Sequence, residues 1–160
     1  MPSRYGETTP NLTNCYNESI MKFASLDART YALRFDPGDD ILAELTGFCT
    51  RQTITNASIA GLGSIENPTL AHYSIHTKQF TTRELPGVFE ITTLAGNVAL
   101  VDGQPAVHVH VAIADDQMRG FGGHLMAGAC SATLELILTA YPSRLSKSHS
   151  DAIGLNVWDF

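Results

Sequence analysis

The sequence predicts an α+β fold, a mainly antiparallel β-sheet of about seven strands with one main packed helix. Most periodic segments alternate apolar and polar residues, which is typical of half-buried strands. Short turn signals join these segments and favour antiparallel neighbours, and only one long segment has the helical period. With 160 residues, of which 44% are hydrophobic, the chain can bury one core. We therefore expect a single domain over residues 23–160, preceded by an N-terminal arm over residues 1–22.

The first elements are expected within the first third of the chain. Residues 1–22 are polar and without periodicity, which indicates a loose arm. Apolar residues alternate over 30–35 and predict a strand. From 40 to 52 the apolar residues recur at i, i+1, i+4, i+7 and i+8, the pattern of an amphipathic helix, and Asp39 is the expected N-cap.

Four further segments continue the sheet through the middle of the chain: 55–65, 68–77, 78–86 as a hairpin region, and 88–101. Gly61 and Gly63 predict a bend in the first of them, because glycine inside a strand marks bulges and close backbone approach. The last is expected either as two short strands divided at Gly96 or as one bent strand. His72 and His76 are expected on a solvated face, outside any site.

The candidate functional residues, three histidines, lie in the stretch 103–128. Asp102-Gly103 is a hairpin signal that leads into a strand over 106–114. In a strand, His108 and His110 lie on one face with Cα atoms about 6.5 Å apart, and His124 follows an expected glycine turn over 120–123. Spacing alone leaves two interpretations open. One is a three-histidine metal site, and the other is a group of hydrogen-bonded core histidines.

The C-terminal quarter is expected to add one strand and a docked tail. Leucines occupy alternate positions over 128–139, which favours a strand, although the composition also permits a helix. Over 142–160 the last apolar residues are expected to pack onto the body of the protein.

The composition limits which classes of protein this chain can belong to. Ten basic residues are scattered among sixteen acidic ones, for a net charge of −6, so we expect at most weak, salt-sensitive association with DNA. Three widely separated cysteines at positions 15, 49 and 130 suggest neither a disulfide framework nor a thiolate zinc site. The sequence has no secretory pattern and no run of about 20 apolar residues, so we expect a cytoplasmic protein without membrane contact.

Four segments together resemble the PPC domain, which plants and prokaryotes share. They are LRFDPGDDILAELTGF, ASIAGLGSIENPTLAHY, GQPAVHVHVAIAD and GFGGHLMAGACSATLELIL, at 33–48, 57–73, 103–115 and 120–138. The HxH tripeptide followed by GGHL is the most specific part. The resemblance implies an antiparallel sheet with a packed helix, assembled as a homotrimer. It also implies a metal ion, taken to be zinc, on the residues that match the family's three histidines, His108, His110 and His124.

The resemblance implies no reaction, and three classes of function remain. The first is a metal-binding oligomeric module that regulates partners. The second is a metal-dependent enzyme that uses an open coordination position, for which Glu66, Asp115 and Glu135 are candidate bases and no catalytic residue is assigned. The third is DNA association. Plant members of the family carry Arg-Gly-Arg-Pro AT-hook segments, and this sequence contains none. Metal occupancy is expected to fall below about pH 6, because protonated imidazole cannot bind a metal.

Overall fold

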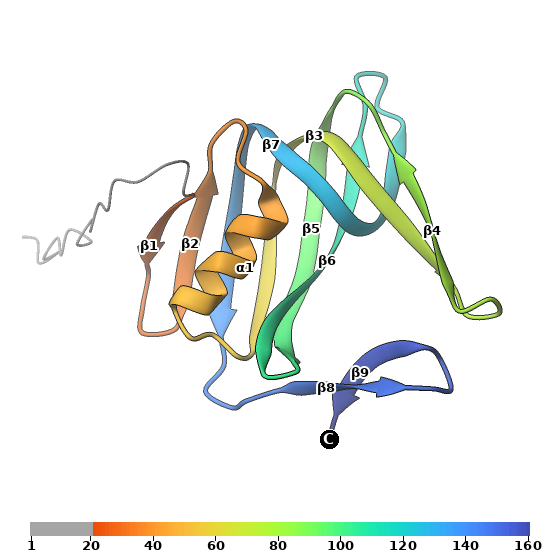
Figure 1. Ribbon diagram of the computed structural model, residues 1–160. Helices are drawn as coiled ribbons and strands as arrows, with labels where there is room; N and C mark the ends of the chain where they lie inside the picture. Colours follow the sequence, from red (N-terminus) through yellow and green to blue (C-terminus); the bar gives the residue numbers. More distant parts are fainter. Residues whose placement is uncertain (1–20) are drawn as a thin grey trace, which may run out of the picture.

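A computed structural model describes residues 21–160 of the protein, so residues 1–20, most of the expected arm, lie outside it. One helix, α1 (Ile41–Arg51), accompanies nine strands in this part of the chain (Figure 1). The strands are β1 (Lys22–Ser25), β2 (Thr30–Phe35), β3 (Ala57–Ser74), β4 (Gln79–Glu84), β5 (Val88–Val101), β6 (Gln104–Ala114), β7 (Gly120–Ala140), β8 (Ser146–Ser150) and β9 (Leu155–Asp159). The predicted α+β class is confirmed.

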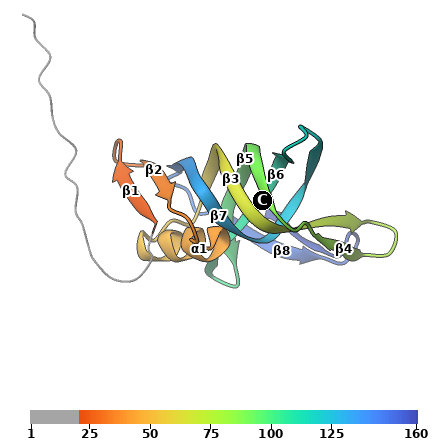
Figure 2. The same ribbon diagram turned by 90° about the horizontal axis from the view of Figure 1, so that it is seen from above.

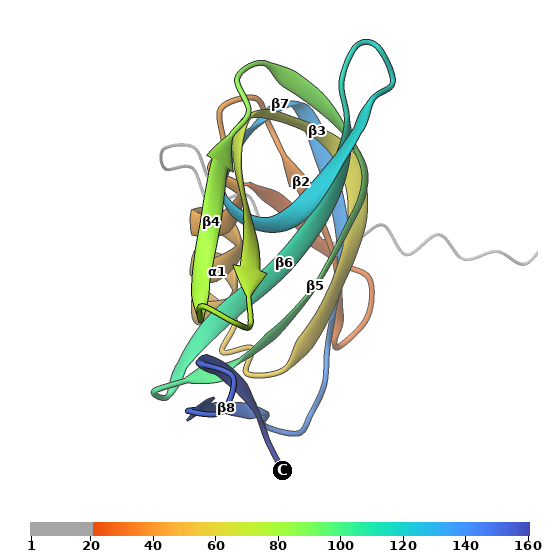
Figure 3. The same cartoon turned by 90° about the vertical axis from the view of Figure 1, so that its right-hand side faces the viewer.

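The sheet follows the order β1-β2-β7-β3-β5-β8-β9, while β4 pairs with β3 and β6 pairs with both β5 and β7. Every pairing is antiparallel except that of β5 with β8. Because β6 bridges β5 and β7, and these two strands both pair with β3, the pairing of the four longest strands closes on itself. Their strong coiling is visible in Figure 3. This closure brings the start of β7 beside the C-terminal half of β6.

The core lies between α1 and the inner face of the sheet. The helix buries Ile41, Leu45, Phe48 and Cys49, and it packs against β6 and β7. On the strands, alternate residues are buried, as the period-two pattern predicted, including the three leucines at 134, 136 and 138. Seen from above in Figure 2, α1 lies against one side of the sheet near β2 and β7.

The N-cap of α1 is Asp40 rather than the expected Asp39. The Asp40 side chain accepts a hydrogen bond of 2.9 Å from the Ala43 amide. Asp39 is buried, and its carboxylate instead accepts from the Asp36 amide at 2.8 Å. The backbone carbonyl of Asp39 also accepts from the Cys130 amide. Two adjacent aspartates each had the right chemistry for a cap, and the tight turn before the helix decided between them.

Two expected strands, 55–65 and 68–77, are one continuous strand, β3. The expected bend at the glycines is confirmed, since the register with β5 shifts between Gly61 and Gly63. Likewise β5 is one strand without a break at Gly96, and its register with β6 shifts between Ile91 and Thr93. Bulges let long strands curl without ending, because they add local twist while pairing resumes on either side.

The C-terminal segment, expected as a docked tail, forms a hairpin of β8 and β9. Tyr73 Oη donates to the Ile153 carbonyl and Lys78 Nζ donates to the Asp151 carbonyl, each at 2.5 Å. These contacts hold the hairpin loop against the end of the β3–β4 hairpin, while Leu100 of β5 pairs with Ser146 of β8. The expectation that the last apolar residues pack onto the body is wrong for Val157, Trp158 and Phe160, which are 36%, 45% and 99% exposed. No helix within residues 21–160 is long and apolar enough to cross a membrane.

Candidate metal centre

Two histidines of the candidate site lie on β6. His108 and His110 alternate with Val109 and Val111, and both valines are buried in the core. The strand therefore anchors itself with one face and presents both imidazoles on the other, as the sequence predicted. Their ring centroids lie 5.1 Å apart.

His124 reaches the same place by a different route from the expected one. The glycines before it do not form a turn, because residues 120–140 are all in β7. The turn lies earlier, around Asp115, and folds β7 back along β6 so that His124 lies directly opposite His110. Glycine is needed at 123 because a Cβ there would lie 2.9 Å from the Ala71 carbonyl oxygen. These glycines permit close packing between strands rather than chain reversal.

The three side chains converge. We call His108, His110 and His124 the histidine cluster. Each offers one ring nitrogen, and the three nitrogens all lie within 4.8 Å of one another. The other two ring-centroid distances are 4.9 Å for His108–His124 and 5.3 Å for His110–His124. Three imidazoles that face one point can bind a metal ion or share hydrogen bonds.

Electrostatics favours the neutral, metal-binding form of two of these rings. Burial, together with the charges of Lys147, His124 and His110, lowers the pKa of His108 to about 4. Burial, together with His110 and Lys147, also lowers the pKa of His124. At neutral pH both rings therefore keep a free nitrogen lone pair. A set of neutral nitrogen donors fits Zn²⁺ and similar transition metals, and it does not fit Mg²⁺ or Ca²⁺.

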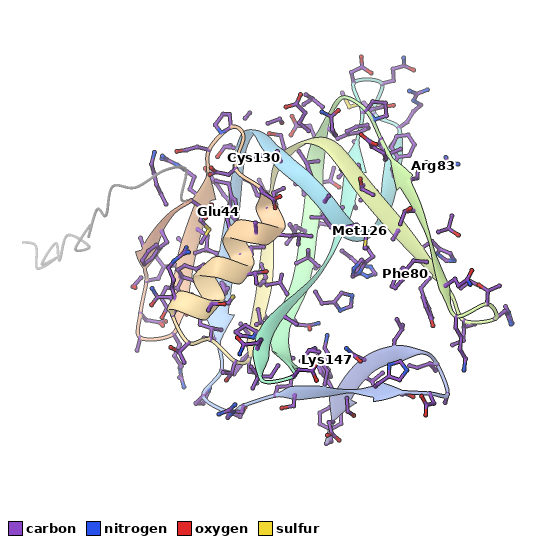
Figure 4. The ribbon with its side chains drawn as sticks, in the orientation of Figure 1. Glu44, Phe80, Arg83, Met126, Cys130 and Lys147 are labelled. Carbon is purple, nitrogen blue, oxygen red and sulfur yellow. The ribbon has the colours of Figure 1, made fainter. Side chains whose placement is uncertain are left out.

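Several neighbours of the histidine cluster were not singled out from the sequence. The Phe80 ring of β4 lies 5.6 Å from the His124 ring, and Asn97 of β5 is the register partner of His108. Asn97 Oδ1 is buried and has no hydrogen-bond partner among the described residues. Lys147 of β8 completes the surroundings, as Figure 4 shows together with Phe80 and Met126. The sequence holds a signal for one of these neighbours. The Asp102-Gly103 hairpin predicts that β5 pairs with β6, and this pairing would have indicated Asn97 as a neighbour of His108.

The other candidate residues do not join the histidine cluster. Asp115 lies at the β6–β7 turn, where its carboxylate pairs with Arg119 at 2.6 Å. Glu135 is exposed on the outer face of the sheet, and Glu66 lies in β3 at the register of Val88 and Ala129. His72 and His76 are exposed, as expected. The described residues thus place no carboxylate within the cluster.

Comparisons with known proteins point to one family. The family model of the "Plants and Prokaryotes Conserved (PCC) domain" matches residues 23–142. The bifunctional protein GlmU of Synechococcus sp. (strain JA-3-3Ab) is 33% identical over 129 residues, which are 79% of this chain and 20% of that protein. The chain therefore spans about a fifth of the length of this curated relative.

Solved structures share the fold. A "putative dna binding protein" from Bacteroides thetaiotaomicron has a TM-score of 0.84 at 25% identity, covering 88% of this chain and 98% of that one. A plant- and prokaryote-conserved (PPC) protein from Pyrococcus horikoshii has a TM-score of 0.77 at 28% identity, covering 91% and 98%. A metal-containing protein from Archaeoglobus fulgidus has a TM-score of 0.77 at 26% identity, covering 88% and 99%. The region matched by the family model, residues 23–142, includes the whole histidine cluster.

Proposed function

The chain belongs to the Plants and Prokaryotes Conserved domain family, and from this premise we propose that it is a homotrimeric metal-binding protein. The metal is a divalent transition metal, zinc, and its ligands are His108, His110 and His124. The biological role that we propose is a regulatory or DNA-associated module, in which the metal site binds a ligand or a partner.

The main observation behind the proposal is that three imidazoles converge on one point. Tetrahedral zinc with Zn–N bonds of about 2.1 Å places its nitrogen ligands about 3.4 Å apart. The cluster nitrogens lie within 4.8 Å of one another, so small side-chain rotations suffice to reach that spacing. Asn97 Oδ1, buried on the strand beside His108, is a suitable acceptor for the second ring N–H of that histidine. The metal-containing relative from Archaeoglobus fulgidus further supports the proposal.

A binding role is favoured over an enzymatic one. Three histidines leave a fourth tetrahedral position open, which a hydrolytic enzyme would use for water. Such an enzyme also needs a general base within hydrogen-bond reach. No carboxylate among residues 21–160 joins the histidine cluster. The metal-dependent enzyme therefore remains the second candidate, supported only by the open position.

Metal uptake at neutral pH tests the proposal. Protein purified without added metal, stripped with chelator and then dialysed against Zn²⁺, is expected to hold one zinc per chain by elemental analysis. His110→Ala is expected to lose most of the metal, because it removes the ligand that lies opposite His124 across β6 and β7. His72→Ala and His149→Ala are the matched controls, since both histidines lie outside the cluster. A wild-type protein that takes up no transition metal would refute the site, and equal loss in His72→Ala would refute the ligand assignment.

The homotrimer finds support in the outer face of the sheet. A groove of about 620 Å³ runs across β1, β2, β3 and β7, and its lining includes Leu62 and Ile137. These side chains belong to residues that are 62% and 45% exposed. Apolar surface gathered on one sheet face is typical of a contact between subunits.

A further inference from the structure

The C-terminal hairpin brings a cation to the histidine cluster. Lys147 lies on β8, beyond the family-matched residues 23–142, and it is half-buried. Within residues 21–160 its ammonium has no hydrogen bond and no ion pair. It is close enough to the cluster that its charge lowers the pKa of His108 and of His124. Figure 4 shows Lys147 on β8, with Phe80 and Met126 on the far side of the same region.

The hairpin that carries Lys147 is fixed in place. Tyr73 and Lys78, both from the β3–β4 hairpin, donate hydrogen bonds to carbonyls of the β8–β9 loop. At the other end the Leu100 amide donates to the Leu145 carbonyl at 2.8 Å. Lys147 is thus held near the cluster from both sides, and little ordering is needed when a ligand arrives.

The charges near this site do not balance. A divalent ion on three neutral imidazoles keeps its full charge of two, and the Lys147 ammonium adds a third. No carboxylate of the described residues joins the cluster to compensate. Like charges in a half-buried place repel each other more strongly than in water, so an anion between them would be bound well.

We propose that Lys147 and the metal together bind the carboxylate of a small, partly apolar molecule, an inference that rests on the metal site proposed above. One carboxylate oxygen occupies the fourth metal position and the other accepts from the ammonium. The Lys147 ammonium is a single point charge without the bidentate fork of a guanidinium, and it matches the single charge of a carboxylate. Phe80 and Met126, at 42% and 43% exposure, supply apolar surface for the body of the molecule.

Binding of benzoate to the Co²⁺-loaded protein tests this inference. Visible absorption of Co²⁺ reports a change in its ligands, and metal content is measured first in every sample. We expect Lys147→Met to keep its Co²⁺ and to bind benzoate at least about tenfold more weakly, the loss typical of a hydrogen bond to a charged group. Lys147→Arg is expected to retain most of the affinity. Lys147→Gln replaces the methionine variant if circular dichroism shows that the latter is unfolded.

Arg83→Met is the matched control for the loss of one positive charge. Arg83 is exposed on β4, where it alternates with Phe80 and Thr82 and therefore points to the opposite face. Benzoate affinity is expected to be unchanged in this variant.

The possible outcomes separate the two proposals. Wild-type protein that takes up no Co²⁺ and no Zn²⁺ would remove the metal site and this inference with it. Full metal loading with equal benzoate affinity in wild type and Lys147→Met would overturn the role of Lys147 alone. Loss of metal from a folded Lys147→Met variant would show that Lys147 is itself a ligand, which also overturns it. Inorganic phosphate that displaces benzoate at lower concentration would overturn the assignment to carboxylates.

Discussion

At the scale of single residues, the candidate site depends on how three imidazoles are held. His110 and His124 face each other across β6 and β7, and His108 follows on the same face of β6. The buried valines on the other face fix the direction in which β6 points its histidines. The site is therefore positioned by the core rather than by a loop, and its geometry is expected to persist without a metal.

The lowered pKa of His108 has a consequence for the metal-free protein. The unfolded chain binds a proton at this residue below about pH 6.5, whereas burial in the folded protein holds the pKa of His108 at about 4. The free energy of unfolding is therefore expected to decrease as the pH falls from about 6.5 to about 4, with no further contribution from this residue below that. Thermal unfolding in EDTA over this range measures the effect.

His108→Asn is expected to flatten this dependence, and His76→Asn, at an exposed position, is expected to leave it unchanged. Equal pH dependence in wild type and His108→Asn would contradict the argument. The same lowered pKa of His108 means that protons compete with a metal only at lower pH than for an ordinary histidine, so half-occupancy is expected below pH 6.

At the scale of elements, the sheet depends on glycine where strands approach most closely. Gly61 of β3 lies between β5 and β7, and a Cβ there would overlap the Glu135 carbonyl oxygen and lie 2.9 Å from the Leu136 Cα. We expect Gly61→Ala to lower the free energy of unfolding by about 1–3 kcal/mol, because backbone atoms must shift to make room. Urea unfolding at neutral pH measures this loss.

Gly120→Ala is the matched control for this substitution. Gly120 also lies in a strand of the sheet, at the start of β7, but a Cβ there would meet no atom within 4 Å. The control is expected to unfold at nearly the wild-type urea concentration. A Gly61→Ala variant as stable as the control would show that β3 and β7 are less tightly paired than described.

At the scale of the whole molecule, the outer groove predicts assembly. Sedimentation equilibrium is expected to give three times the chain mass of 17.3 kDa at micromolar concentration. Leu62→Lys is expected to dissociate the trimer without unfolding the chain, because residue 62 is 62% exposed in the single chain and a buried ammonium would disrupt the contact. Val157→Lys, on β9 and outside the groove, is the control. Wild-type protein that sediments only as a monomer would refute the assembly.

Charge distribution also sets an expectation for DNA. Three of the basic residues, Lys22, Arg34 and Arg119, already form ion pairs with aspartates. Few phosphates can then be neutralised together, so we expect weak binding to a 20-base-pair duplex that disappears as salt rises. Fluorescence anisotropy at about 150 mM salt measures it, and a submicromolar dissociation constant there would contradict the prediction. Assembly of the trimer could gather a basic patch, so the measurement uses the assembled protein.

The sequence by itself determined the elements whose period is unambiguous. Alternation in β2 and in the second half of β7 fixed which residues face the core, and the 3.6-residue period located α1 to within one residue at each end. The HxH tripeptide placed His108 and His110 on one face, since neighbouring strand residues point in opposite directions. His124 was the third candidate from its position after the glycines, the family resemblance supported it, and the structure brings all three together.

Only the tertiary structure decided where the chain turns and what surrounds the site. Glycine has the same local signature whether it permits a turn or a close strand contact, so the segment before His124 was expected to turn and instead extends β7. The two potential caps at 39 and 40 were separated by a turn whose backbone also forms hydrogen bonds with Cys130, a distant residue on β7. Lys147 carries no local signal at all. Its place beside the histidine cluster results from a hairpin docked by Tyr73 and Lys78, contacts that span more than 70 residues.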